Sequence, residues 1–245
     1  MTALDKDIIP DDFETLYLRL RESEGRIYTD EEVAQLPTIT TTHPHYKEWQ
    51  IRSESSQVLI DYLQRKKQPT DILEIGCGNG WLSHRLSAIP SVKVIGTDIN
   101  FTEIQQAARI FQNISNLHFI YVHIEPGVFK DKKFDIIVFA ASMQYFESLT
   151  EVINNTLRLL KPNGEIHIID SAFYSLSELG AAKQRSRLYY QEAGFPEMAN
   201  CYFHHSLDDL DNYNYKILYD PKSLLKKLLR NKNPFPWICI QQKDI

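Results

Sequence analysis

The chain has 245 residues, of which 43% are hydrophobic, and carries a formal net charge of -5 at pH 7. This composition is enough for one sizeable core, and the negative charge disfavours nucleic acid and anionic membranes as partners. The cysteines show no C-x-x-C spacing, and the acidic N-terminus lacks the apolar core of a secretory signal. We therefore expect a cytoplasmic protein, a monomer or a homodimer, with no membrane partner.

The first 55 residues are expected to form a helical and irregular extension ahead of a main domain at 56–245. Thr29, followed by the acidic run Asp30–Glu32, has the pattern of a short capped helix. Residues 40–45 include a proline and several polar residues, which predict an irregular segment. The pair His43 and His45 falls short of a complete ligand set, so no metal site is expected.

From about residue 56 onward, apolar strand-like runs alternate with helical segments, which is typical of a parallel sheet covered by helices. Thr102 is the expected N-cap of one helix, and Lys161–Gly164 is expected to end another. The predicted helices cover residues 56–64, 81–88, 102–111, 149–160, 176–193 and 223–230, and the predicted strands cover 71–75, 92–97, 117–122, 134–139, 165–170, 215–219 and 237–241.

The turn after the first predicted strand is the most informative segment. Glycines stand at positions 76, 78 and 80, where glycine lets the backbone turn tightly and approach a bound molecule. The next strand ends in Asp98, placed to accept hydrogen bonds from both hydroxyls of a ribose. Together, the glycines and this carboxylate predict a site for a nucleotide-type cofactor.

The glycine spacing differs from the dinucleotide pattern G-x-G-x-x-G, because Trp81 stands where the third glycine or alanine would be. The segment Glu74–Gly80 instead resembles the first motif of the class I S-adenosylmethionine-dependent methyltransferases of the small-molecule, type 11-like kind. Phe134-Asp and Leu-Lys-Pro-Asn-Gly, ending at Gly164, resemble the segments around that family's fourth and fifth strands. The resemblance extends over about residues 56–170.

This resemblance implies an α/β fold with a Rossmann-like, seven-stranded, mostly parallel sheet, helices on both faces and an antiparallel last strand. The N-terminal extension would cap the site. It also implies S-adenosyl-L-methionine as cofactor and S-adenosyl-L-homocysteine as product. The implied cofactor-binding residues are Glu74, Gly76, Cys77, Gly78, Asn79, Gly80, Asp98, Ile99, His123, Ile124 and Ala140.

The chain departs from the family pattern in two places. His123 stands where many members have an acidic residue beside the adenine, and Gln144 and Tyr145 stand where a histidine pair is frequent. Histidine is the commonest general base, and the paired histidines at 204 and 205 follow two aromatic residues. The candidate catalytic residues are His204, His205 and Tyr145, the candidate substrate-binding residues are Tyr46, Trp49, Arg52, Gln144 and Tyr145, and Tyr28, His43 and His45 are further pocket candidates.

The sequence therefore favours an enzyme that transfers a methyl group from S-adenosylmethionine to a small-molecule acceptor by in-line displacement. Two alternatives stay open. One is a catalytically inactive, cofactor-binding regulatory protein on the same fold. The other is a nicotinamide-dependent oxidoreductase, which the glycine spacing disfavours.

Overall fold

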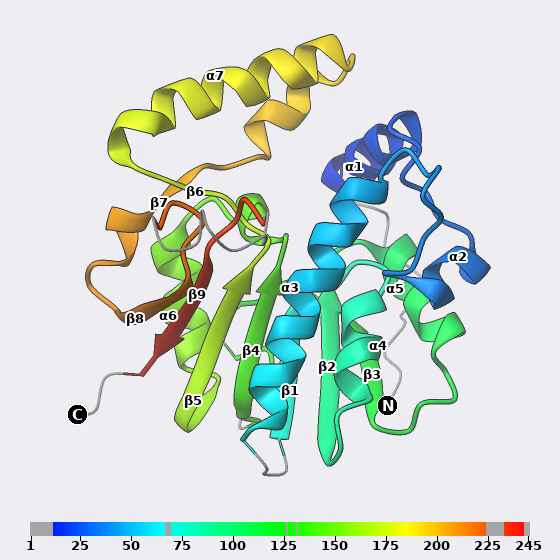
Figure 1. Cartoon of the computed structure of the whole chain (residues 1–245), viewed down its shortest axis with the longest axis vertical. Helices are drawn as coiled ribbons and strands as arrows, with labels where there is room; N and C mark the ends of the chain where they lie inside the picture. The colour runs from blue at the N-terminus through cyan, green and yellow to red at the C-terminus, as the bar shows by residue number, and fades with distance from the viewer. Residues whose placement is uncertain (1–11, 67–69, 126, 131, 224–232, 243–245) are drawn as a thin grey trace.

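The computed structural model describes residues 12–66, 70–125, 127–130, 132–223 and 233–242, and it places a central sheet between helices (Figure 1). The helices are α1 (Asp12–Ser23), α2 (Asp30–Gln35), α3 (Tyr46–Gln64), α4 (Trp81–Ser87), α5 (Phe101–Ile110), α6 (Leu149–Leu157) and α7 (Leu176–Glu192). Short 3₁₀ helices are η1 (Met143–Tyr145), η2 (Pro196–Asn200) and η3 (Leu207–Leu210). Within the described ranges, no helix is both long enough and apolar enough to cross a membrane.

The sheet has seven strands, and its topology confirms the predicted fold. Across the sheet, the order is β3 (Leu117–Tyr121), β2 (Val92–Asp98), β1 (Thr70–Ile75), β4 (Phe134–Ala140), β5 (Leu160–Ile169), β9 (Trp237–Gln241) and β8 (Asn214–Tyr219). Strands β3, β2, β1, β4 and β5 pair in parallel, each with the next in this order. The last strand in sequence, β9, runs antiparallel to both of its neighbours. Two short strands, β6 (Phe173–Tyr174) and β7 (His205–Ser206), pair with each other outside this sheet.

Helices cover both faces of the sheet because side chains of a strand alternate between faces. On β1, Ile72 packs in one buried cluster with Leu59 of α3 and Leu82 of α4. The next residue, Leu73, packs in a second buried cluster with Ile153 of α6. Burying each of these side chains contributes about 1.5–3 kcal/mol, so both layers stabilise the sheet.

A roof, which we define as α1, α7 and η2, lies beyond the carboxyl ends of the parallel strands (Figure 1). Leu20 of α1, Tyr190 of α7 and Met198 of η2 pack in one buried cluster. The backbone N–H of Thr102, in the first turn of α5, donates to Glu14 Oε1 of α1 at 3.1 Å. The roof therefore rests on the sheet edge where the strand-to-helix turns lie.

The predicted N-cap of α5 was wrong. The helix begins at Phe101, and the cap is Asn100, whose side-chain oxygen accepts from the backbone N–H of Glu103 at 3.0 Å. Thr102 lies inside the first turn, where its own backbone N–H is bound by Glu14. Asparagine is as good an N-cap as threonine, so the residue types alone do not decide whether Asn100 or Thr102 caps the helix.

Two further boundaries differ from the prediction. Helix α3 begins at Tyr46, whereas the helix was predicted to begin at residue 56. The predicted helix 149–160 ends at Leu157, and β5 already begins at Leu160, because Lys161 Nζ binds the carboxylates of Asp71 at 2.6 Å and Asp135 at 2.8 Å. These contacts hold the segment beside β1 and β4. Most of the helix predicted at 223–230 lies outside the described residues.

Candidate functional site

A cavity of about 460 Å³, hereafter the main cavity, opens at the carboxyl ends of the parallel strands. Its floor is made by the turns that follow β1, β2, β3 and β4, and its cover by residues of α1 and α3. The crevice at the carboxyl ends of the strands is the usual ligand site of an open parallel sheet. The volume is within the range of small-molecule and cofactor sites.

The glycine turn forms one wall of the main cavity, and two of its glycines face protein atoms. A Cβ on Gly76, whose φ is +75°, would lie 2.4 Å from Ser142 Cβ. A Cβ on Gly80, whose φ is +77°, would lie 2.5 Å from the ring of Phe119. The missing side chains therefore let the turn pack against β3 and the loop after β4, which brings the backbone between them to the cavity.

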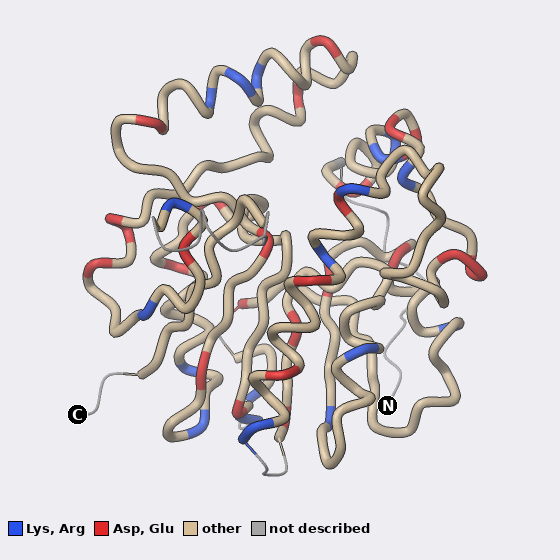
Figure 2. The backbone as a smooth tube through the Cα atoms, in the orientation of Figure 1, with Lys and Arg blue, Asp and Glu red and all other residues tan. Residues whose placement is uncertain are grey.

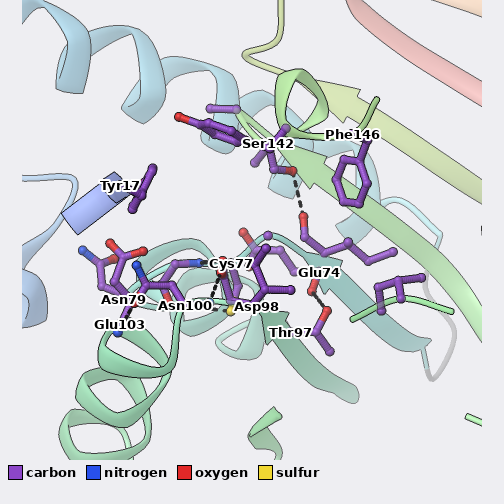
Figure 3. Close-up of a pocket in the computed structure, with 18 of the residues that line it drawn as sticks. Tyr17, Glu74, Cys77, Asn79, Thr97, Asp98, Asn100, Glu103, Ser142 and Phe146 are labelled. Carbon is purple, nitrogen blue, oxygen red and sulfur yellow. Dashed lines mark hydrogen bonds between the residues drawn. The ribbon is translucent and has the colours of Figure 1, made fainter. Parts of the chain in front are cut away.

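Asp98 stands at the end of β2 and binds the turn directly (Figure 3). Its Oδ2 accepts from the backbone N–H of Gly78 at 2.7 Å, and its Oδ1 accepts from that of Asn100 at 2.8 Å. Burial raises the pKa of Asp98, and these N–H groups oppose the rise. A carboxylate has about four acceptor positions, so both oxygens can still accept from a ligand.

Glu74, at the end of β1, is only 2% exposed and lines the same cavity. Ser83 Oγ of α4 donates to its Oε2 at 2.5 Å, but burial dominates and raises the pKa of Glu74 to about 8. Burial, with the nearby Asp98 carboxylate, likewise raises the pKa of Glu103 to about 7. Three carboxyl groups thus converge on one side of the main cavity, an arrangement that favours a positively charged ligand.

Two buried side-chain amides in the lining of the main cavity each have one atom without a partner among the described residues. Asn79 Oδ1 and Asn100 Nδ2 have no hydrogen bond within the described part of the chain, and both residues line the cavity. Buried polar atoms are normally satisfied, so an unpaired acceptor and donor in a cavity wall point to ligand contacts. Figure 3 shows Asn79, Asn100 and Glu103 beside Asp98 on the same side of the pocket.

The other residues predicted to bind cofactor gather around this cavity. The described lining includes Cys77 and Gly78 but not Gly80, which packs against the ring of Phe119. Ile99 directly follows β2, His123 and Ile124 follow β3, and Ala140 ends β4, and all four residues belong to the described lining.

The predicted substrate-binding residues separate into two groups. Trp49 and Arg52 of α3 line the main cavity together with Tyr145. Tyr145 and Gln144 line a neighbouring hollow of about 340 Å³ under the roof, hereafter the side cavity. Tyr46 is absent from the described lining of both, and its hydroxyl accepts from Gln50 Nε2 at 3.1 Å.

Of the further pocket candidates, Tyr28 lines the main cavity and accepts from Trp49 Nε1 at 2.9 Å. The ring of His43 stacks on Tyr28, and His45 Nε2 donates to the backbone oxygen of Glu24 at 2.8 Å. The two histidines thus contact residues 24 and 28 and hold the segment that carries Tyr28.

The paired histidines are absent from the described lining of both cavities. His205 is buried in β7, where its Nε2 donates to the backbone oxygen of Met143 at 3.1 Å. His204 Nε2 is hydrogen-bonded to Ser186 Oγ of α7 at 2.9 Å, and its ring lies against Tyr202. These contacts fix the loop that carries Tyr145 and the position of α7.

Residues of α1 complete the main cavity, and sequence reasoning missed them. Phe13, Tyr17 and Arg21 lie one helical turn apart and all line it. Tyr17 faces Tyr145 edge-on with ring centroids 5.7 Å apart, and Arg21 Nη2 donates to the Tyr145 hydroxyl at 3.3 Å. The spacing of four residues between Phe13, Tyr17 and Arg21 was the available signal.

A second cluster of ionisable groups lies away from the cavities, on β5 and β9. Glu165, His167 and Cys239 are buried with their potential ligand atoms within 4.8 Å of one another. His167 Nδ1 accepts from Trp237 Nε1 at 3.1 Å, so its Nε2 carries the proton and donates to Glu165 at 3.1 Å. Because both ring nitrogens are engaged and Lys66 pairs with Glu165, the cluster forms a closed hydrogen-bond network.

Residues 66–237 match the family model described as a methyltransferase domain. Over 151 residues the chain is 30% identical to malonyl-(acyl-carrier protein) O-methyltransferase of Halalkalibacterium halodurans, which covers 54% of this chain and 55% of that protein. The chain thus spans about half the length of the curated relatives it matches.

Solved structures share the fold. The CurJ carbon methyltransferase has a TM-score of 0.61 at 16% identity, covering 94% of this chain and 68% of that chain. Magnesium protoporphyrin IX methyltransferase from Synechocystis PCC 6803, solved with bound SAH, has a TM-score of 0.57 at 14% identity, covering 97% and 98%. At these identities the likeness is one of fold.

Proposed function

The chain belongs to the methyltransferase domain family, and we propose that it transfers a methyl group from S-adenosylmethionine to a small-molecule acceptor. The observation that carries this proposal is the convergence of Glu74, Asp98 and Glu103 on one cavity at the carboxyl edge of the sheet. S-adenosylmethionine brings a sulfonium and an ammonium group, and carboxylates in a buried site favour such cations.

The residues of the main cavity fit this cofactor. Asp98 retains acceptor positions for the ribose hydroxyls, and Glu74 lies deeper, where its carboxylate suits the ammonium group. The unpaired Asn79 Oδ1 and Asn100 Nδ2 offer one further acceptor and one further donor. Ile99, His123 and Ile124 supply the side of the cavity for the adenine ring.

When bound, S-adenosylmethionine would supply a methyl group on a sulfonium, which a nucleophile of the acceptor displaces in line. The contribution of the chain is then chiefly to exclude water and to align the acceptor. The roof does the first, since Phe13 and Tyr17 of α1 cover the main cavity. Tyr145 is placed for the second, because it lines both cavities.

Tyr145 is therefore our candidate for contact with the acceptor. Its hydroxyl accepts from Arg21, which leaves its own O–H as a donor. His204 and His205 act as positioning residues in this proposal, because they hold the surrounding loop and α7.

Titration calorimetry tests the proposal with S-adenosylmethionine, S-adenosylhomocysteine and NADH. We expect binding of the first two and none of NADH, and NADH binding alone would support the oxidoreductase alternative. A mass increase of one methyl group in a metabolite mixture then separates an active enzyme from a cofactor-binding regulatory protein.

A further inference from the structure

The side cavity differs in charge from the main cavity, although the two adjoin. Arg21, Arg26, Glu48 and Tyr145 line both cavities, so the arginines stand at the junction. The described lining of the side cavity contains no aspartate, and its glutamates are the two that pair with these arginines.

The charged side chains at the junction form one alternating row. Glu24 lies 3.1 Å from both Arg21 and Arg26, through Nη1 and Nε respectively. Glu48 lies 2.6 Å from Arg26 Nη2 and 2.9 Å from Arg52 Nη2. The row begins and ends with an arginine, so the row itself has three guanidinium groups, two carboxylates and a net charge of +1. Outside the row, Glu103 interacts with Arg21 and Arg52, and Asp170 interacts with Arg52.

Glu48 cannot offset that charge further, because it is already ionised. Burial opposes the ionisation of Glu48, but Arg26 and Arg52 outweigh it and lower its pKa to about 2. The arginine side chains are only 20–22% exposed, so water screens the excess charge weakly. A buried excess charge is costly unless a counter-ion reaches it.

Arg26 also holds an unused donor. Its Nε is buried and has no hydrogen-bond partner in the described ranges, although a Glu24 oxygen lies 3.1 Å away as an ion-pair partner. A guanidinium group has five N–H donors in a rigid plane, an arrangement that matches carboxylate and phosphate oxygens.

The rest of the side cavity is rich in hydrogen-bond donors. Burial raises the pKa of Tyr202 to about 12, and it also raises the pKa of Tyr190, so both phenols keep their protons. Ser186 and Arg185 of α7 complete that side. Figure 2 shows basic segments along α7, which carries Lys183, Arg185 and Arg187.

We propose that the methyl acceptor is an anion whose carboxylate or phosphate oxygens bind Arg26 and Arg21 in the side cavity. This inference rests on the proposed function, since it assumes a methyl donor in the main cavity. The anionic group lies among the arginines, and the attacking atom faces the main cavity past Tyr145. A row of ion pairs that only braces the roof would not distinguish an anion from a neutral molecule of the same shape.

Calorimetry on the full chain, saturated with S-adenosylhomocysteine, tests the inference with phenylacetate, phenyl phosphate, phenylacetamide and phenethylamine. Binding of S-adenosylhomocysteine is measured first, so its failure refutes the proposed function separately. We expect at least one of the two anions to bind at least about tenfold more tightly than the amide, which corresponds to one charge-assisted hydrogen bond. The tighter anion identifies carboxylate or phosphate as the recognised group.

Variants locate the site. Arg26→Gln is expected to reduce the preference for the anion to within about threefold, and Arg185→Gln to weaken it less. Arg158→Gln is the matched control, since Arg158 is exposed at the opposite end of the sheet, after α6. If Arg26→Gln fails to fold, the comparison of anion and amide on the unaltered chain and on Arg185→Gln still decides. Equal or tighter binding of the amide or amine, no anion binding, or an anion preference that survives in folded Arg26→Gln would overturn the inference.

Discussion

The main cavity and the side cavity are built in opposite ways. The floor of the main cavity consists of turns at the ends of β1, β2, β3 and β4, and its charged groups include the carboxylates of Glu74 and Asp98. The side cavity lies between α1, α7 and the loop after β4, and its excess charge comes from Arg21 and Arg26. One site is built mainly by a sheet edge, the other mainly by packed helices.

This difference explains why the fold constrains the main cavity more than the side cavity. In a parallel sheet the carboxyl ends of neighbouring strands must meet, so Glu74 and Asp98 come together wherever β1 and β2 pair. The side cavity instead depends on contacts between distant segments, such as Leu20 with Tyr190. The opposite charges of the two cavities suit ligands of opposite charge.

The largest expected effect is in the floor. Gly80→Ala should lower the free energy of unfolding by about 3 kcal/mol or more, because its Cβ would overlap the ring of Phe119 in addition to the strain of a positive φ. Gly25→Ala is the control in the segment after α1, since Gly25 also has a positive φ but no atom within 4 Å of the added Cβ. Gly25→Ala should lower the free energy of unfolding by about 1 kcal/mol. Urea unfolding compares them, and equal losses would show that the floor tolerates repacking.

Asp98 tests whether the two cavities bind independently. Asp98→Asn should weaken S-adenosylmethionine binding by about 1–3 kcal/mol through the lost charge-assisted hydrogen bonds. Calorimetry with Asp61→Asn, an exposed change on α3, is the control. Phenylacetate binding to the side cavity should not change, and a parallel loss of both ligands would mean that the cavities form one unit.

Much of the floor was predictable because its residues are contiguous in sequence or stand at strand ends. The strand 71–75, the glycines and Asp98 follow from local composition and spacing, and the topology confirms the predicted parallel sheet. The structure adds that Gly76 and Gly80 face Ser142 and Phe119, which no local pattern shows. Glu103 was not predicted to line the cavity, because an acid in a first helical turn is ordinary.

The roof was less predictable because tertiary contacts position it. Arg21 and Arg26 look like solvated charges in sequence, and only the packing of α1 against α7 places them at a cavity. His204 and His205 drew attention by their chemistry, yet their rings bind Ser186 and the Met143 carbonyl. A motif identifies residue types, whereas burial and partners decide what those residues contact.

The pH dependence of cofactor binding probes the carboxylates of the floor. Because the pKa of Glu74 is raised to about 8, its stabilising protonated form is lost as the pH rises from the unfolded value of about 4.3 through 8, so the free chain should become less stable. A cation favours the ionised form, so S-adenosylmethionine affinity should rise by up to about tenfold between about pH 6 and about pH 7. Calorimetry in buffers of different ionisation enthalpy would detect the released proton. Glu74→Gln should flatten this dependence, and a slope unchanged in that variant would assign the proton to another group, such as Glu103.

The smallest effect is expected for His204, which tests the roof as scaffold. His204→Gln keeps a partner for Ser186 Oγ, so the free energy of unfolding should fall by no more than about 1 kcal/mol and methyl transfer should change less than about threefold. Tyr145→Phe, which removes the hydroxyl bound by Arg21, should lower methyl transfer more while leaving S-adenosylmethionine affinity unchanged. A loss of turnover in His204→Gln with the fold and cofactor binding intact would contradict this scaffold role and would place His204 in the reaction itself.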